Sequence, residues 1–524
     1  MVRLLNLYTI SAIVALGGAL FGFEIASMSG IIGTRQYKQF FNNPIGIHQG
    51  IITSAMACGS FVGSLLSPFL ADSRSRKVTI QIATILWCIG ACLQSAASGV
   101  NMLIVGRSVA GLGIGLTSTV VPIYQSEIAP RQIRGRLVTL QGVALGSGLL
   151  IQYLIQYGCS FINSTASFRL PWAIQTLPAI LLFIALFWLP RSPRWLAYQD
   201  RWDEALHVLA FLRSANCDIN DPLVLAEYKE IEAQIMVERQ NNSNSYHELV
   251  SKGLRTRLII AMVIQGLTQL SGINFLMYFI VNILNSISNS NTVVASSILY
   301  TIGLIASIVV AIWTDQWGRR LSLLLGSIGM SLWMILAGVL FAIFGEENQV
   351  RNEAFTWVII GRPVVSGFIQ ASMYLFELSY SLSWGPVSLM YPPEILPQRV
   401  RAKGVALAFA TNWALNTVIG LAIPTLWRTI VWRIFIIFGS FSVASFLFVL
   451  LLVPETKQRT LEEMDEVFEH GGPLWRSFTD RGNHDRLDIL AREIEMADTE
   501  RFRRDLQWQL AGSRKDVLAD TSKT

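Results

Sequence analysis

Twelve apolar runs, each long enough to cross a lipid bilayer as a helix, constrain the fold of this chain more than any other feature. A membrane-spanning helix needs about 20 predominantly apolar residues, because the hydrocarbon core is about 30 Å thick. The runs lie near residues 5–29, 48–71, 78–98, 102–123, 137–157 and 171–189, then 258–284, 294–314, 321–344, 363–390, 403–425 and 432–453. The sequence therefore predicts an all-α membrane protein with two six-helix halves.

The composition agrees with a multi-pass membrane protein. Of the 524 residues, 52% are hydrophobic and 15% are charged, whereas soluble globular proteins carry about 25% charged residues. The first run is too long for the core of a cleavable signal peptide, so we expect it to remain as a membrane helix. The five cysteines show neither metal-ligand spacing nor a disulfide framework. We expect no catalytic centre, no metal and no cofactor, and no ATP-driven transport.

The basic residues predict the orientation of the helices. The net charge is +6, and we interpret it as a topology signal rather than as a nucleic-acid surface, because basic residues concentrate in cytoplasmic loops. They follow the second, fourth, eighth and tenth runs: Arg74, Arg76, Lys77, Arg131, Arg134, Arg136, Arg319, Arg320, Arg399, Arg401 and Lys403. Both termini are then cytoplasmic, and Asn163 in "NST" faces outward as a glycosylation acceptor.

Four segments follow from these patterns. They are a six-helix half (1–189), a cytoplasmic helical linker (190–257), a second six-helix half (258–453) and a cytoplasmic tail (454–524). The linker contains "RWDEALHVLAFL" and "LAEYKEIEAQIMVERQ", whose apolar residues have helical spacing. In the tail, "RLDILAREIEMADTERFRRDLQWQL" has the same spacing and is expected to form a surface helix or a partner site.

The two halves carry matching motifs at equivalent places. The second run of each half is followed by a similar motif, "ADSRSRK" in the first half and "TDQWGRR" in the second. The fourth run of the chain is followed by "SEIAPRQIRGR", and the tenth by "PEILPQRVRAK". This pattern indicates a parallel repeat. Transporters built from such repeats bind their substrate near the middle of the membrane, between the halves.

Nine motifs in order give the chain a family resemblance. They are "GRSVAGLGIG" (106–115), "VPIYQSEIAP" (121–130), "RGR" (134–136), "PRSPRWLA" (190–197), "QLSGIN" (269–274), "DQWGRR" (315–320), "WGPVSLMYPPEI" (384–395), "NWALN" (412–416) and "VPETK" (453–457). Over about residues 5–465 the chain resembles the sugar porter family of the major facilitator superfamily, and is most similar to fungal hexose and pentose transporters. The resemblance implies the major facilitator fold.

The resemblance also implies a gate at the cytoplasmic ends of the helices. It is made of ion pairs that stabilise the outward-facing state. The residues that match are Asp72, Arg76, Glu127, Arg134, Arg136, Asp315, Arg319, Arg320, Glu394, Arg399 and Arg401. Many pairs at the rim of a bundle can bias a two-state equilibrium. The alternative is that they only set topology and cap helices. Arg191 replaces an acid of the family pattern, and Ser73 and Ser75 also depart from it.

A sugar site needs amides and hydroxyls as donors and acceptors, together with an aromatic ring against the apolar face of the sugar. By resemblance, the candidates are Gln269, Asn274, Tyr278, Trp413 and Asn416, with Asn412 and Gln141 adjacent to family positions. The alternative for a membrane-embedded amide is a bond that only joins helices. Four family contact positions are filled differently here, by Gly142, Thr268, Gly303 and Leu389. We therefore expect a larger or less polar pocket, or a different substrate such as a polyol.

Glu24 lies inside the first apolar run, in "GGALFGFEIASMSG". A charge at that depth costs about 2.5–3.5 kcal/mol on insertion scales. By resemblance, Glu24 takes the place of the acid of proton-coupled sugar porters, and Arg107 that of the arginine facing it. Separation of such a pair favours protonation of the carboxylate, which would couple the proton to the direction in which the cavity faces. The alternative is a static ion pair that joins two helices.

These observations predict a monomeric secondary transporter that moves a hexose or pentose with a proton across the plasma membrane. Its partners are then a sugar or polyol, a proton and the lipid bilayer, with no nucleic acid. Two alternatives stay open: a passive sugar or polyol facilitator in which Glu24 is structural, and a sugar receptor that does not transport.

Overall fold

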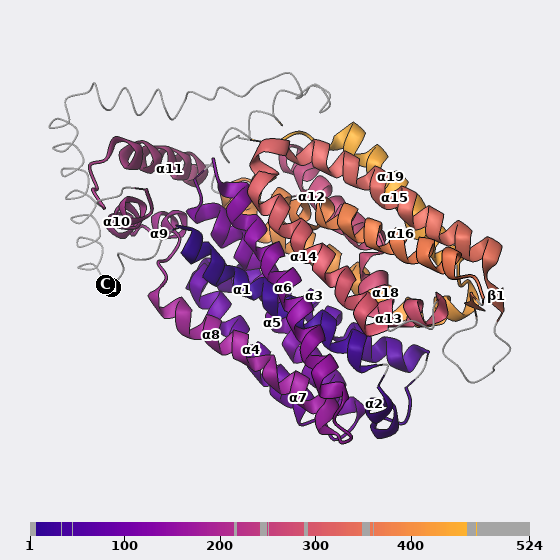
Figure 1. The fold of residues 1–524 in the computed structure, drawn as a ribbon. Helices are drawn as coiled ribbons and strands as arrows, with labels where there is room; N and C mark the ends of the chain where they lie inside the picture. The colour runs from indigo at the N-terminus through magenta and orange to yellow at the C-terminus, as the bar shows by residue number, and fades with distance from the viewer. Residues whose placement is uncertain are drawn as a thin grey trace. The chain divides into compact units, whose positions relative to one another are not determined.

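The computed structural model describes residues 7–32, 34–44, 46–130, 132–213, 217–240, 249, 251–287, 292–347, 357–359, 361–457 and 468. Almost all of them are helical (Figure 1). The helices up to residue 188 are α1 (Leu7–Ile31), α2 (Arg35–Phe40), α3 (Ile47–Arg74), α4 (Arg76–Ser95), α5 (Val100–Ile128), α6 (Arg134–Ser160), α7 (Ala166–Ile174), α8 (Thr176–Ala185) and the 3₁₀ helix η2 (Leu186–Trp188).

Three helices follow before the second half begins: α9 (Pro193–Tyr198), α10 (Trp202–Arg213) and α11 (Pro222–Gln240). The second half contains α12 (Lys252–Leu270), α13 (Ile273–Ile287), α14 (Thr292–Trp317), α15 (Arg319–Phe344), β1 (Glu346–Glu347), β2 (Trp357–Val358), α16 (Pro363–Ser381), α17 (Trp384–Ile395), α18 (Gln398–Thr429) and α19 (Arg433–Leu452). The two strands pair antiparallel. Neither they nor α2 was expected, because they are too short to show a periodic pattern.

Eleven segments of the described chain are long and apolar enough to cross a membrane. The tenth predicted run instead forms two shorter helices, α16 and α17, which are separated at Leu382 and Ser383. The seventh run is also broken, between α12 and α13, where Gly272 has a φ of +90°. Only glycine adopts that backbone conformation without a steric cost. The helical membrane architecture predicted from the sequence is confirmed, with one short pair of strands added.

The chain divides into two compact units. One comprises Met1–Leu189 with Tyr246–Phe478, and the other comprises Pro190–Ser245 with Thr479–Thr524. In the second unit, α9, α10 and α11 pack around an apolar core of their own that includes Leu209, Val224 and Tyr228. The helices expected between the halves are therefore present. Their amphipathic pattern is explained by this local core.

Within the larger unit, the two six-helix halves lie side by side (Figure 1). In the first half α1 packs against α6, and α5 packs against both α3 and α4. The halves meet through α3 with α18 and through α6 with α14. Glycines permit the close approach of α3 and α5. A Cβ atom on Gly111 would lie 2.1 Å from the carbonyl oxygen of Met56, and one on Gly115 would lie 2.2 Å from that of Ser60. Small residues at such interfaces are typical of membrane helices.

The matching motifs of the two halves have the same backbone geometry. Ser75 joins α3 to α4 with φ +90° and ψ 155°. Gly318 joins α14 to α15 with φ +85° and ψ 156°. This conformation suits glycine and strains any residue that carries a Cβ atom. The first half therefore holds a serine where the turn favours glycine.

We predict that Ser75→Gly stabilises the protein. Relief of the backbone strain is worth about 1 kcal/mol, and the bond lost is a 3.4 Å contact from the Val78 amide to the Ser75 hydroxyl. The apparent Tm in detergent, followed by tryptophan fluorescence, should rise by about 1–2 °C. Gly318→Ser is the matched control and should lower it, because its Cβ atom would lie 2.7 Å from Glu455 Oε2. A lower Tm for Ser75→Gly would contradict this explanation.

Candidate functional site

A cavity lies between the two halves, with about 1060 Å³ of empty space including its opening. It is lined by α1, α5 and α6 of the first half and by α12, α13, α14, α16, α17 and α18 of the second. Its polar lining includes Ser118, Gln141, Gln265, Thr268, Gln269, Asn274, Tyr300, Ser307, Glu377, Tyr380, Ser381, Ser388 and Asn412. A cavity of this size and polarity accommodates a small polar molecule.

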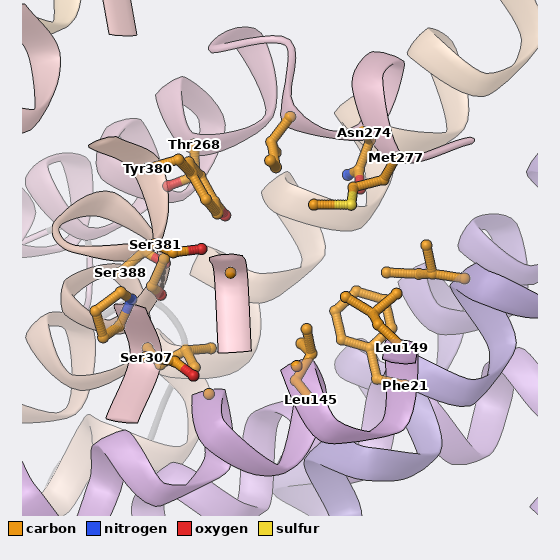
Figure 2. Close-up of a pocket in the computed structure, with 18 of the residues that line it drawn as sticks. Phe21, Leu145, Leu149, Thr268, Asn274, Met277, Ser307, Tyr380, Ser381 and Ser388 are labelled. Atoms are coloured by element: carbon orange, nitrogen blue, oxygen red, sulfur yellow. Dashed lines mark hydrogen bonds between the residues drawn. The ribbon is translucent and has the colours of Figure 1, made fainter. Parts of the chain in front are cut away.

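The two halves contribute different chemistry to the wall. The labelled first-half residues in Figure 2 are the apolar Phe21, Leu145 and Leu149. Most of the labelled second-half residues carry a hydroxyl or an amide, as Ser307 and Tyr380 do. A ligand rich in hydroxyl groups would therefore find most of its hydrogen-bond partners in the second half.

Five of the seven residues named for the sugar site line the cavity: Gln141, Gln269, Asn274, Asn412 and Trp413. The other two, Tyr278 and Asn416, are buried but are not part of the described lining. The Tyr278 hydroxyl donates to Asn416 Oδ1 at 3.3 Å. This bond between α13 and α18 matches the alternative role of an amide that joins helices.

A chain of amides connects four helices at the cavity. Gln269 Nε2 donates to Asn412 Oδ1 at 2.9 Å, and Asn274 Nδ2 donates to Gln269 Oε1. Asn412 Nδ2 donates in turn to Gln265 Oε1 at 2.7 Å, and Gln265 Nε2 donates to the carbonyl of Ser388 at 2.6 Å. These bonds fix the orientation of each amide. The sequence analysis missed Gln265, although it lies four residues before Gln269 and so on the same helix face.

Trp413 is positioned by contacts from the first half. Its Nε1 donates to Ser118 Oγ at 3.1 Å. The ring of Phe21 meets it edge to face, with 4.9 Å between the centroids. The indole is thereby held at the cavity by a partner for its polar atom and by an aromatic contact.

The four positions that depart from the family pattern all line the cavity: Gly142, Thr268, Gly303 and Leu389. A Cβ atom on Gly142 would have no neighbour within 4 Å, so this substitution leaves open space. A Cβ atom on Gly303 would lie 2.6 Å from Glu377 Oε1, so that space is already filled. Glu377 was missed by the sequence analysis. The sequence feature that singled out Glu24, an acid inside an apolar run, could have singled out Glu377 as well.

Glu24 and Arg107 form an ion pair between α1 and α5, with 2.9 Å between Glu24 Oε1 and Arg107 Nη1. Both side chains are 0% exposed. Gln94 Nε2 also donates to Glu24 Oε2, at 3.4 Å. The guanidinium nitrogens of Arg107 make no well-aligned hydrogen bond to any described residue. The pair is therefore held mainly by charge, and neither member is among the described residues that line the cavity.

Two matching charge clusters lie at one end of the bundle, which we call the charged end. In the first half, Arg76 lies between two acids. Its Nη1 is 3.3 Å from Asp72 Oδ1, and its Nη2 is 3.0 Å from Glu127 Oε1. Arg76 Nη1 also donates to the carbonyl of Ala71 at 3.1 Å.

The second half repeats this arrangement around Arg319. Its Nη2 lies 3.2 Å from Asp315 Oδ1 and 2.9 Å from Glu394 Oε1. Arg319 Nη1 donates to the carbonyl of Thr314 at 3.4 Å. The parallel repeat predicted from the motifs thus extends to the hydrogen bonds of individual side chains.

Asp315 also connects the two halves. Its Oδ1 accepts from the backbone N–H of Gly135 at 3.1 Å, and its Oδ2 accepts from that of Arg136 at 3.0 Å. Both amides belong to the first turn of α6, where backbone N–H groups lack helical partners and favour a negative charge. The guanidinium of Arg136 is 3.9 Å from Asp315 and one-third exposed, so it adds little.

The remaining predicted gating residues lie at the same end. The side chain of Arg320 donates from Nη2 to the carbonyl of Leu450 at 2.6 Å, and Arg401 donates from Nε to that of Leu396 at 3.1 Å. Arg134 is buried at the start of α6. The side chain of Arg399 lies outside the described residues. Asn163 lies in the exposed loop between α6 and α7, and its glycosylation stays a prediction.

Comparison with known proteins agrees with this architecture. The family model described as Sugar (and other) transporter matches residues 10–468. The MFS glucose transporter mfs1 of Aspergillus flavus is 42% identical over 94% of this chain and 95% of its own length. A high-affinity glucose transporter of Kluyveromyces lactis is 39% identical over 90% of this chain and 87% of its own length.

A solved structure shares the fold. It is the major facilitator superfamily proton:xylose symporter XylE bound to 6-bromo-6-deoxy-D-glucose, with a TM-score of 0.76 and 22% identity. The match covers 88% of this chain and 99% of that one. The family and both relatives are transporters, which confirms the prediction that the chain is not an enzyme.

We predict that Gly135→Ala opens the charged end. The added Cβ atom would lie 2.1 Å from Asp315 Oδ1 and 2.6 Å from Arg319 Nη2, so α6 and α14 must separate or lose these bonds. Spin labels at the exposed positions Gln132 and Gln316 of a cysteine-free protein would report the distance between the halves. We expect the distribution to shift to longer distances.

The matched control is Gly158→Ala on the same helix, where a Cβ atom would meet nothing within 4 Å. It should leave the distances unchanged. Equal distributions for Gly135→Ala and the unmodified sequence would show that Asp315 does not hold the halves together.

Proposed function

Because this chain belongs to the Sugar (and other) transporter family, we propose that it carries a monosaccharide, a hexose or pentose, across the membrane together with a proton. The observation that carries the proposal is the fully buried pair of Glu24 and Arg107 in a bundle whose cavity is lined by amides. The pair supplies a proton site, and the amides supply a site for an uncharged, hydroxyl-rich solute.

The cavity chemistry supports a sugar as the solute. A sugar hydroxyl both donates and accepts, and the side-chain amides of Gln269, Asn274 and Asn412 offer both kinds of group. The indole of Trp413 offers an apolar surface against which a sugar ring can pack. The names of the relatives make D-glucose the first substrate to test.

Alternating access is supported by the contacts at the charged end. Asp315 holds the first turn of α6 from the opposite half, and this contact must break for the cavity to open there. We place this end in the cytoplasm with both termini, and we place the protein in the plasma membrane as a monomer. We also propose the four segments predicted from the sequence, with a cytoplasmic linker at 190–257 and a cytoplasmic tail from 454.

Proton coupling follows from the way the ion pair is held. Because Arg107 makes no well-aligned hydrogen bond to the described residues, a small relative movement of α1 and α5 weakens its attraction to Glu24. A buried carboxylate without its counter-charge favours the neutral, protonated form. The proton is then carried with the movement of the helices. When the pair re-forms after the cavity has opened to the other side of the membrane, the proton is released.

Passive transport is the second candidate function. Neither Glu24 nor Arg107 is among the described residues that line the cavity. A pair that never meets water would be a static link between α1 and α5, and the sugar would move without a proton.

We predict that Glu24→Gln abolishes proton coupling without abolishing sugar binding. In cells lacking their own sugar carriers, D-glucose should alkalinise the medium through the unmodified protein, and uptake should fall as external pH rises. Glu24→Gln cannot exchange a proton, so it should give no alkalinisation and pH-independent exchange of sugar. Glu204→Gln, which removes an exposed acid on α10, should behave as the unmodified protein. Alkalinisation that persists in Glu24→Gln would favour the static pair.

We also predict that Gln269→Ala raises the KM for D-glucose about tenfold, because a lost hydrogen bond in a desolvated site is worth about 1–2 kcal/mol. The matched control is Gln125→Ala. Gln125 is an equally buried amide that bonds the carbonyl of Ser11 and does not line the described cavity. The control should lower stability and leave KM unchanged. Equal KM values for both variants would assign Gln269 to helix packing.

A further inference from the structure

Glu377 is a buried acid of the bundle that belongs neither to the gate nor to the ion pair of Glu24 and Arg107. It lies on α16, is 3% exposed and lines the cavity. Its Oε1 accepts from Ser381 Oγ at 2.7 Å. Its Oε2 has no hydrogen-bond partner among the described residues, and no salt bridge of the described chain includes it.

An unpartnered carboxyl oxygen is costly in a place that excludes water. Leaving a buried acceptor without a partner destabilises a protein, and more so when the group is ionised. The described polar groups that share the cavity with it on α14 and α16 are hydroxyls, such as those of Ser307 and Tyr380 in Figure 2, not lysine or arginine. Oε2 is covered by its neighbours in this conformation, and a ligand in the cavity would supply the missing partner when those neighbours move aside.

We propose that Glu377 binds a hydroxyl group of the sugar through Oε2, as a specificity-determining residue of the transport site. This inference rests on the proposed function and deepens it. The carboxyl group of Glu377 pairs with a sugar hydroxyl in either state, as an acceptor when ionised and as a donor when protonated. Glu377 would therefore select sugars that present a hydroxyl at that position.

Gly303 provides an independent reason for this assignment. Residue 303 of α14 is a glycine that lines the cavity together with Glu377. A Cβ atom on Gly303 would lie only 2.6 Å from Glu377 Oε1. A side chain at 303 and the carboxyl of Glu377 therefore compete for the same space. The glycine makes room for a polar group that reaches the cavity from α16 instead of α14.

The first experiment exchanges these two residues. Glu377→Val should raise the KM for D-glucose uptake at least tenfold. Gly303→Asn alone should also impair uptake, because it meets the carboxyl. The double variant should recover to within about threefold of the unmodified protein, since each change relieves the defect of the other.

A second experiment tests direct contact with the sugar. Binding of D-glucose and of its monodeoxy derivatives to purified protein is measured by tryptophan fluorescence. The unmodified protein should bind one derivative at least tenfold more weakly than D-glucose. Glu377→Val should bind that derivative and D-glucose equally, because in this variant the hydroxyl that distinguishes the two sugars has no partner.

Two alanine variants keep the test decisive if Glu377→Val fails to fold. Gly303→Ala displaces the carboxyl without removing it and should weaken binding of D-glucose several-fold. Gly367→Ala adds the same methyl group on α16, outside the described cavity lining and with nothing within 4 Å, and should leave binding unchanged.

An unchanged KM in Glu377→Val, or equal binding by the two alanine variants, would overturn the assignment of Glu377. In that case D-glucose would still alkalinise the medium through the unmodified protein, and the proposed function would stand. An unmodified protein that reaches the cell surface and neither binds nor transports any sugar would overturn both proposals.

Discussion

The bilayer core offers no water to hydrogen-bond with polar groups, and this constraint explains where the polar side chains of the bundle lie. Backbone groups are satisfied within helices, so the chain crosses the membrane only as helices. A charge must bring its own partner, as Glu24 does with Arg107 at 2.9 Å. Buried amides likewise bond one another, as Gln269 and Asn412 do across α12 and α18. Polar chemistry is therefore concentrated where it has a partner or a cavity.

The internal repeat shows how one motif acquires two roles. Arg76 and Arg319 hold equivalent acids with nearly the same geometry. Asp315 has the additional task of accepting two amide protons from α6 across the boundary between the halves. That contact needs a glycine at position 135, where the carboxyl approaches the backbone. The ion pair of Asp315 with Arg319 is therefore also part of a contact between the halves, one that depends on the conformation of the transporter.

The helical architecture could be predicted because apolar runs of about 20 residues have few other solutions. Two details could not. The break between α16 and α17 at Leu382 and Ser383 lies just before Gly385 and Pro386, but the apolar run continues through all four residues and hides it. The seventh run breaks next to Gly272. In the cavity, a family pattern indicated Gln269 and Asn274, but it could not indicate Gln265 or Glu377. Each has a local signal, an amide on the helix face of Gln269 and an acid inside an apolar run, but whether it reaches the cavity depends on how helices far apart in the sequence meet.

In the proposed symport, Glu24 and Glu377 divide the chemistry between them. Glu24 is compensated by a fixed charge within the first half, so its protonation responds to movement of the helices. Glu377 lies in the second half and has a hydroxyl donor on one oxygen only, so its remaining oxygen responds to what enters the cavity. A proton site that senses conformation and a sugar site that senses the ligand need not touch. They are coupled if both bias the same movement of one half against the other.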